Sequence, residues 1–204
     1  MSQAQSPKPE APSPETRGVG VETVVKIGGG LLAHPAHFDA VLAVIRDVAS
    51  ERRLLIVPGG GPFADAVRHA DRQFTLSDDA AHWMAVLAMD QYAHLIVSRL
   101  AGSVLVADPG EAVAAFGAGR LPVLAPSRWM RDADPLPHSW DATSDSIAAW
   151  VAGVIGARRF VLVKPPGAAD GSVDAYFHRT LPAHVTSTIV PADQMDALRA
   201  ALCS

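Results

Sequence analysis

Residues 22–30 read ETVVKIGGG and residues 54–61 read LLIVPGGG, and these two stretches decide the fold. In each, a short run rich in β-branched and aliphatic residues predicts a buried strand, and a glycine triplet ends it. Apolar residues at helical spacing follow the first stretch at positions 38, 41, 42, 45 and 49, and a short helix is expected near residues 63–69. Two successive strand–glycine–helix units predict parallel strands whose carboxyl ends open at one edge of a sheet.

The rest of the chain continues this alternation. Further strands are expected at residues 104–107, 121–125, 160–163 and 186–190, and further helices at 78–100, near 111–116, at about 144–155 and at 195–202. Residues 126–142 are interpreted as a long polar loop. Alternating strands and helices pack as a sheet covered on both faces, so the sequence predicts an α/β fold, a three-layer αβα sandwich with a mostly parallel open sheet.

Composition limits the class of function. The chain has 204 residues, 49% of them hydrophobic, a formal charge of −4, and Cys203 as its one cysteine. One domain is expected over residues 21–204, and the Pro- and Ser-rich residues 1–20 are expected to form a disordered tail. The mild charge disfavours nucleic acid as a partner, and no apolar run approaches the roughly 20 residues of a membrane span. We therefore expect a soluble, cytoplasmic protein that binds neither nucleic acid nor membranes.

Lys26 stands between the first strand and the glycines at 28–30. Glycines let backbone N–H groups approach an anion, a helix N-terminus adds partial positive charge, and a lysine attracts a phosphoryl group in transfer. A tight turn is the alternative interpretation of one glycine triplet. The second triplet, at 59–61, favours phosphate binding, because two loops at matching positions form a facing pair for two anionic groups.

Residues 138–146, HSWDATSDS, are the third motif and run into a helix. Hydroxyl residues and aspartate at a helix start are ordinary caps, and capping alone explains much of this stretch. It explains less well why His138, Trp140 and Asp145 gather there. Asp145 is placed to orient Lys26 through a charge-assisted hydrogen bond, and His138 and Trp140 to shape an acceptor pocket.

The strand ending in VVKIGGG, the later VPGGGPFADAVR and the helix-opening TSDS together resemble the amino-acid kinase family, over about residues 22–202. The resemblance implies ATP as donor, with Mg²⁺ arriving on the nucleotide and no dedicated metal ligands in the protein. Lys26 and Asp145 are the implied catalytic residues, and Gly28, Gly29, Gly30 and Ser146 the implied nucleotide contacts. The implied acceptor contacts are Gly59, Gly60, Gly61, Phe63, Arg68, His138, Trp140 and Thr143.

Within that family the chain resembles in particular the kinases of methanofuran-type cofactor biosynthesis, a part of one-carbon metabolism. The shared pattern is a PGGG loop, a helix bearing His82 and then Met89 and Asp90, and HSW followed by TSDS. This resemblance implies a small acceptor that already carries a phosphate, [5-(aminomethyl)furan-3-yl]methyl phosphate. The family resemblance implies a homo-oligomer, a dimer or higher, built through the helix near residues 78–100, with a hetero-oligomer with a related kinase as the alternative.

The chain departs from the family pattern at residues 163–167, where VKPPG stands in place of Thr-Asp-x-x-Gly. The lysine expected before the last strand is absent, and Lys26 and Lys164 are the only lysines outside the tail. Two interpretations stay open. Either Lys164 or Arg179 supplies the second catalytic cation, or the protein is a degenerate homologue that binds a ligand or a kinase partner. No HExxH or GxSxG occurs, which disfavours hydrolase chemistry.

Overall fold

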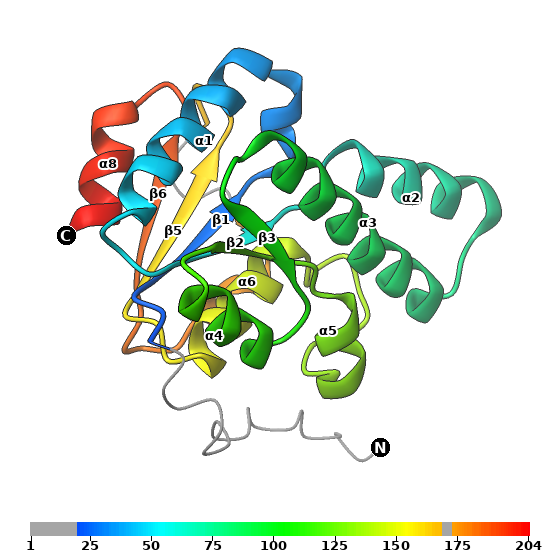
Figure 1. Ribbon diagram of the computed structural model, residues 1–204. Coiled ribbons are helices and arrows are strands. Elements are labelled where there is room, and N and C mark those ends of the chain that lie inside the picture. Colours follow the sequence, from blue (N-terminus) through cyan, green and yellow to red (C-terminus); the bar gives the residue numbers. More distant parts are fainter. Residues whose placement is uncertain (1–19, 169–172) are drawn as a thin grey trace.

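The computed structural model describes residues 20–168 and 173–204, and its centre is one six-stranded sheet (Figure 1). The strands are β1 (Thr23–Ile27), β2 (Leu54–Pro58), β3 (Ser103–Val106), β4 (Leu121–Leu124), β5 (Arg159–Lys164) and β6 (Thr186–Pro191). They lie in the order β3-β4-β2-β1-β5-β6, and every neighbouring pair is parallel. The predicted α/β architecture is confirmed, with β1 and β2 side by side at the centre.

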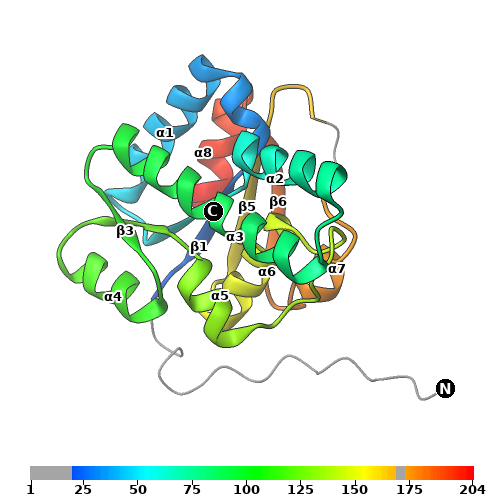
Figure 2. The same ribbon diagram turned by 90° about the vertical axis from the view of Figure 1, so that its right-hand side faces the viewer.

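Helices cover both faces of the sheet (Figures 1 and 2). They are the 3₁₀ helix η1 (Gly29–Ala33) and the α-helices α1 (Pro35–Ala49), α2 (Gly61–Phe74), α3 (Asp78–Arg99), α4 (Pro109–Gly117), α5 (Ser127–Ala133), α6 (Ser144–Val154), α7 (Phe177–Thr180) and α8 (Met195–Cys203). One core joins α1, α8 and the second half of α3 to the sheet, and the other joins α4, α5 and α6. Helix α2 packs along α3, and the pair stands beside the sheet in Figure 1.

The alternation of side chains along the strands decides which residues meet α6. Ile27 belongs to the core on the α1 side, whereas Val24 belongs to the core on the α6 side. Lys26 follows Val24 by two residues and therefore points toward α6. On the neighbouring strand β5, Leu162 belongs to the same α6-side core, so Lys164 points that way too. The pleat thus directs both lysines to one face.

Residues 126–142 were expected to be loop, but they contain helix α5. Met130 is fully buried, and the ring of Trp129 lies 4.7 Å from that of Trp150 on α6, measured between centroids. Two adjacent apolar side chains in a seven-residue helix show no readable periodicity, so the pattern alone could not reveal it. The helix is stabilised by its contact with α6.

Residues 1–19, nearly all of the expected tail, lie outside the described part of the chain. Within the described ranges, no helix combines the length and the hydropathy needed to cross a membrane.

Candidate active site

The two glycine loops touch each other at the carboxyl edge of the sheet. The Gly59 amide donates to the carbonyl oxygen of Ile27 across 2.8 Å. A Cβ built on Gly29 would lie 2.1 Å from the backbone nitrogen of Gly61, closer than any side chain allows. Backbone packs on backbone here, which only glycine permits. The expected pairing of the loops is present in the structure.

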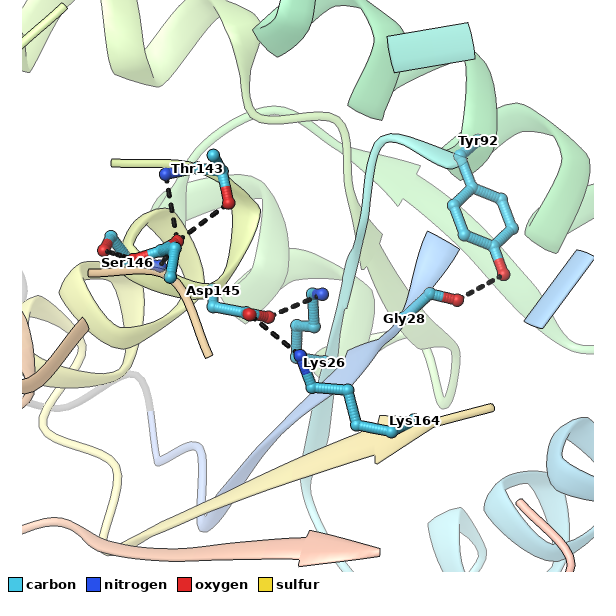
Figure 3. Close-up of polar contacts among 8 residues, drawn as sticks. Lys26, Gly28, Tyr92, Thr143, Asp145, Ser146 and Lys164 are labelled. Atoms are coloured by element: carbon cyan, nitrogen blue, oxygen red, sulfur yellow. Dashed lines mark hydrogen bonds and ion pairs between the residues drawn. The ribbon is translucent and has the colours of Figure 1, made fainter. Parts of the chain in front are cut away.

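Asp145, in the first turn of α6, contacts both lysines of the described chain (Figure 3). The ammonium nitrogen of Lys26 lies 2.7 Å from Oδ1 of Asp145, and that of Lys164 lies 2.8 Å from Oδ2. The Lys164 contact is an aligned hydrogen bond, whereas the Lys26 contact is an ion pair with less regular geometry. All three residues are buried. The expected orientation of Lys26 by Asp145 is present, and Lys164 joins it.

Burial and charge act in opposite directions on these groups. Burial is the main influence on Lys26 and lowers its pKa; Asp145 opposes this effect, and the positive charge of Lys164 adds to it. Burial of Asp145 would raise the pKa of its carboxyl, but the two lysines outweigh burial and lower it. Two amines therefore share one ionised carboxylate, which favours the approach of a further anionic group.

Arg179, the other candidate for a second cation, lies elsewhere. Its guanidinium is exposed and sits 5.6 Å from the ring centroid of Tyr176. Lys164 is therefore the residue that accompanies Lys26 at Asp145 among the described side chains.

A cavity of about 320 Å³ opens beside the glycine loops. From the predicted site residues, its wall includes Gly29, Gly30, Gly60, Gly61, Arg68, Trp140 and Thr143. The guanidinium carbon of Arg68 lies 4.7 Å from the ring centroid of Trp140, whose Nε1 donates to Asp71 across 2.8 Å. Helix α2 and the segment before α6 thus hold Trp140 at the cavity wall.

Three predicted contact side chains are absent from the wall of this cavity. Phe63 packs against the core on the α1 side. His138 is absent from the cavity wall; its Nδ1 lies 3.0 Å from a carboxylate oxygen of Asp79, and its Nε2 lies 2.8 Å from one of Asp134. Ser146 is fully buried within the first turn of α6. Gly28 and Gly59 are also absent from this wall, and the direct contact of these five residues with a ligand stays a prediction.

Asp174 explains where Ser146 points. The amide and hydroxyl of Ser146 both donate to the Asp174 carboxylate, the amide across 3.0 Å. The amide and hydroxyl of Thr143 do the same, across 2.9 and 2.8 Å. Asp174 lay outside every sequence motif. The one signal was that Ser146 occupies the place of the Glu or Gln in a capping box, which leaves this helix start in need of an acceptor from elsewhere.

His82 lines the cavity and was noted in the sequence only as part of a resemblance. Its ring stacks on His138, with centroids 4.1 Å apart and planes inclined by 14°. Its Nε2 is buried and has no hydrogen-bond partner among the described residues. Burial, helped by the proximity of His138, lowers the pKa of His82 to about 4, so its ring is neutral at pH 7.

His82, His138 and Asp134 bring three potential metal ligands within 4.8 Å of one another. Nearly parallel, stacked rings cannot both aim their in-plane lone pairs at one ion, however, and His138 already bonds two carboxylates. We therefore interpret this cluster as a packed support for the cavity wall.

Comparison with known proteins identifies the family of this chain. The sequence profile of the amino acid kinase family matches residues 22–165. The chain belongs to the amino acid kinase family. It is accordingly an ATP-dependent phosphotransferase. Among curated proteins it is similar to the [5-(aminomethyl)furan-3-yl]methyl phosphate kinase of Methanocaldococcus jannaschii, with 27% identity over 158 residues, 75% of this chain and 68% of that protein.

Solved structures of other kinases share the fold of this family member. The uridylate kinase of Archaeoglobus fulgidus superimposes with a TM-score of 0.65 at 16% identity, over 88% of this chain and 96% of that one. The UMP kinase of Ureaplasma parvum gives a TM-score of 0.63 at 13% identity, over 85% and 90%. At such identities the likeness concerns the fold alone.

Proposed function

We propose that this kinase transfers a phosphoryl group from ATP to the phosphate of a small acceptor of the [5-(aminomethyl)furan-3-yl]methyl phosphate type. The observation that carries the proposal is that one carboxylate, Asp145, holds Lys26 and Lys164 together beside paired glycine loops and a cavity. The name of the curated relative states that it phosphorylates this acceptor, and the proposed chemical class of the substrate is taken from that name.

Lys26 and Lys164 would stabilise the charge that spreads over the phosphoryl oxygens during transfer. The acceptor phosphate is already an anion, so it can attack the γ-phosphorus without a general base. A new P–O bond to the acceptor oxygen forms while the bond between the γ-phosphorus and the ADP oxygen breaks. Asp145 holds both amines in place, and each of its two carboxylate oxygens contacts one of them. The residues therefore act by position and charge.

The site fits a nucleotide that brings its own metal. The first glycine loop offers close backbone approach for phosphates, and Pro165 packs near it, since a Cβ on Gly30 would meet the Pro165 ring at 2.8 Å. Both oxygens of Asp145 are taken by lysines, which leaves that carboxylate unavailable as a ligand for Mg²⁺. The ion would be held by phosphates and water, where it neutralises developing charge.

The cavity suits an acceptor with an anionic and a cationic end. Arg68, which pairs with Asp65 across 3.0 Å, and the amides of Gly60 and Gly61 suit a phosphate, while Asp78 adds a carboxylate that suits an ammonium group. Met89 belongs to the same wall and adds apolar lining that suits a small ring. A 320 Å³ space is at the small end of ligand cavities, which agrees with a compact acceptor.

A direct assay tests the proposal. The purified protein, with Mg-ATP and [5-(aminomethyl)furan-3-yl]methyl phosphate, should produce ADP and a diphosphate that ³¹P NMR detects as two coupled signals. UMP and the unphosphorylated furan alcohol serve as competing acceptors. ADP formation with UMP but not with the furan phosphate would overturn the acceptor assignment. Absence of turnover with every acceptor, despite tight Mg-ATP binding, would favour a ligand-binding role.

A further inference from the structure

Asp174 caps the helix start that carries Asp145. Its carboxylate accepts hydrogen bonds from the amides and hydroxyls of Thr143 and Ser146. Thr143 is the N-cap of α6, yet its own side chain caps nothing in that helix. The helix start that carries Asp145 is therefore capped by a carboxylate 28 to 31 residues further along the chain.

The segment that presents Asp174 is itself anchored to β5. Phe177, three residues on, is buried and stacks on Phe160 of β5, with ring centroids 5.8 Å apart. The amide of Tyr176 donates to the carbonyl oxygen of Asp141, just before α6, across 2.9 Å. Strand β5 ends in Lys164, which bonds Asp145. The strand therefore supplies one of the two lysines and also anchors the segment that caps α6.

We propose that Asp174 is a positioning residue for the two lysines, fixing the first turn of α6 so that Asp145 meets both amines at once. This inference deepens the proposed function but can be tested without it. The Asp174 carboxylate also accepts hydrogen bonds from two backbone amides at the start of α6. A phosphate bound at this helix N-terminus would need the same two N–H groups. Phosphates are thereby directed to the glycine loops and the lysines.

The chain offers a direct readout, because Lys8, Lys26 and Lys164 are its only lysines. Lysine labelled with ¹³C at the ε-carbon gives three NMR signals, and a pH titration follows each ammonium group without any substrate. Asp174→Asn keeps the size of the side chain and removes its charge. Its Lys26 signal should titrate at a lower pH than in the wild type, because a displaced Asp145 stabilises the ammonium form less, while the Lys8 signal stays unchanged.

Ser146→Ala separates positioning from charge. It leaves the charge of Asp174 in place and removes one hydroxyl donor to it. A smaller shift of Lys26 in the same direction is expected. A response to Asp174→Asn with none to Ser146→Ala would show that Asp174 acts through its field alone and would overturn the proposal. If Asp174→Asn fails to fold, the Ser146→Ala titration still decides.

Asp108→Asn is the matched control, since Asp108 caps α4 through its side chain and contacts Arg128 away from the lysines. It should lower the melting temperature without moving the lysine signals. Where the wild type turns over, Asp174→Asn should lower kcat by roughly tenfold to a hundredfold with little change in KM for the acceptor. A melting temperature lowered as in Asp108→Asn, with lysine titration and kcat unchanged, would reduce Asp174 to an ordinary cap.

Discussion

Lys164 supplies a second ammonium group beside Asp145, at a position where the sequence departs from the family pattern. It lies in the VKPPG stretch, residues 163–167, that replaces the Thr-Asp-x-x-Gly expected from the family resemblance. The structure buries its side chain and bonds its ammonium group to Asp145 at 2.8 Å. The second cation of the site thus comes from the end of β5.

Replacing Lys164 by methionine should lower kcat by about a hundredfold or more, the scale of losing one preorganised electrostatic donor. Because the lysine is buried and bonded, the variant should also lose about 1–3 kcal/mol of stability as Asp145 keeps one partner fewer. Steady-state kinetics and urea unfolding measure both effects. Arg179→Met, which removes an exposed cation that does not contact Asp145, serves as control; a fall in its rate equal to that of Lys164→Met would contradict the assignment.

The lowered pKa of His82 predicts that the free energy of unfolding depends on pH. Its pKa is about 4 in the folded chain and about 6.5 when unfolded, so between these values the unfolded state binds a proton that the native state does not. Stability should therefore fall as pH falls from 6.5 to 4, by up to about 3 kcal/mol from this group. Urea midpoints recorded from pH 7 to pH 4.5 measure the loss. His82→Asn should flatten the curve, and an unchanged slope would assign the effect to other groups.

At the scale of elements, the two glycine loops act as one unit because they pack directly on each other. The loop after β1 and the loop after β2 come from neighbouring parallel strands, whose paired register brings Ile27 opposite Pro58. Any side chain on the contact surface would push the loops apart and move the phosphates they are proposed to hold.

Gly29→Ala tests this contact. The added Cβ would lie 2.1 Å from the Gly61 nitrogen, so the loops must separate. We expect kcat/KM to fall by roughly a hundredfold and stability by about 1–3 kcal/mol. Gly117→Ala is the matched control: the added Cβ meets nothing within 4 Å, and alanine favours the end of α4, so activity should persist with stability equal or slightly higher. Full activity in Gly29→Ala would show that the close approach is dispensable.

At the scale of the whole molecule, helix α3 carries apolar side chains that the rest of the described chain leaves exposed. Met84 and Leu87 are 39% and 43% exposed and lie three residues apart on one side of the helix. Exposed apolar residues that gather in this way are typical of protein interfaces. This is the helix through which the family resemblance predicts a dimer or higher assembly.

Leu87→Glu should convert the predicted oligomer to a monomer, because it would bury a charge at the interface. Light scattering after size-exclusion chromatography measures the mass directly. Val113→Glu, which adds the same charge at an equally exposed apolar position on α4, should leave the mass unchanged. A monomeric wild type, or an oligomer insensitive to Leu87→Glu, would rule out assembly through α3.

Local pattern determined a large part of this protein. Runs of aliphatic residues ended by glycine placed the strands, helical spacing placed the main helices, and their alternation required a parallel sheet with loops meeting at one edge. Strand and helix signals are local, so a single sequence carries them. The pairing of Lys26 with Asp145 was also within reach, because a lysine at a strand end and an aspartate at a helix start open at the same edge.

Only the tertiary structure decided which distant groups meet. The register of β5 beside β1 put Lys164 on the α6 side and gave Asp145 its second amine. Packing of Phe177 on β5 brought Asp174 to the start of α6, and the approach of α3 to residue 138 stacked His82 on His138. Such contacts depend on how whole elements pack across the core, and no periodicity or spacing along the chain encodes them separately.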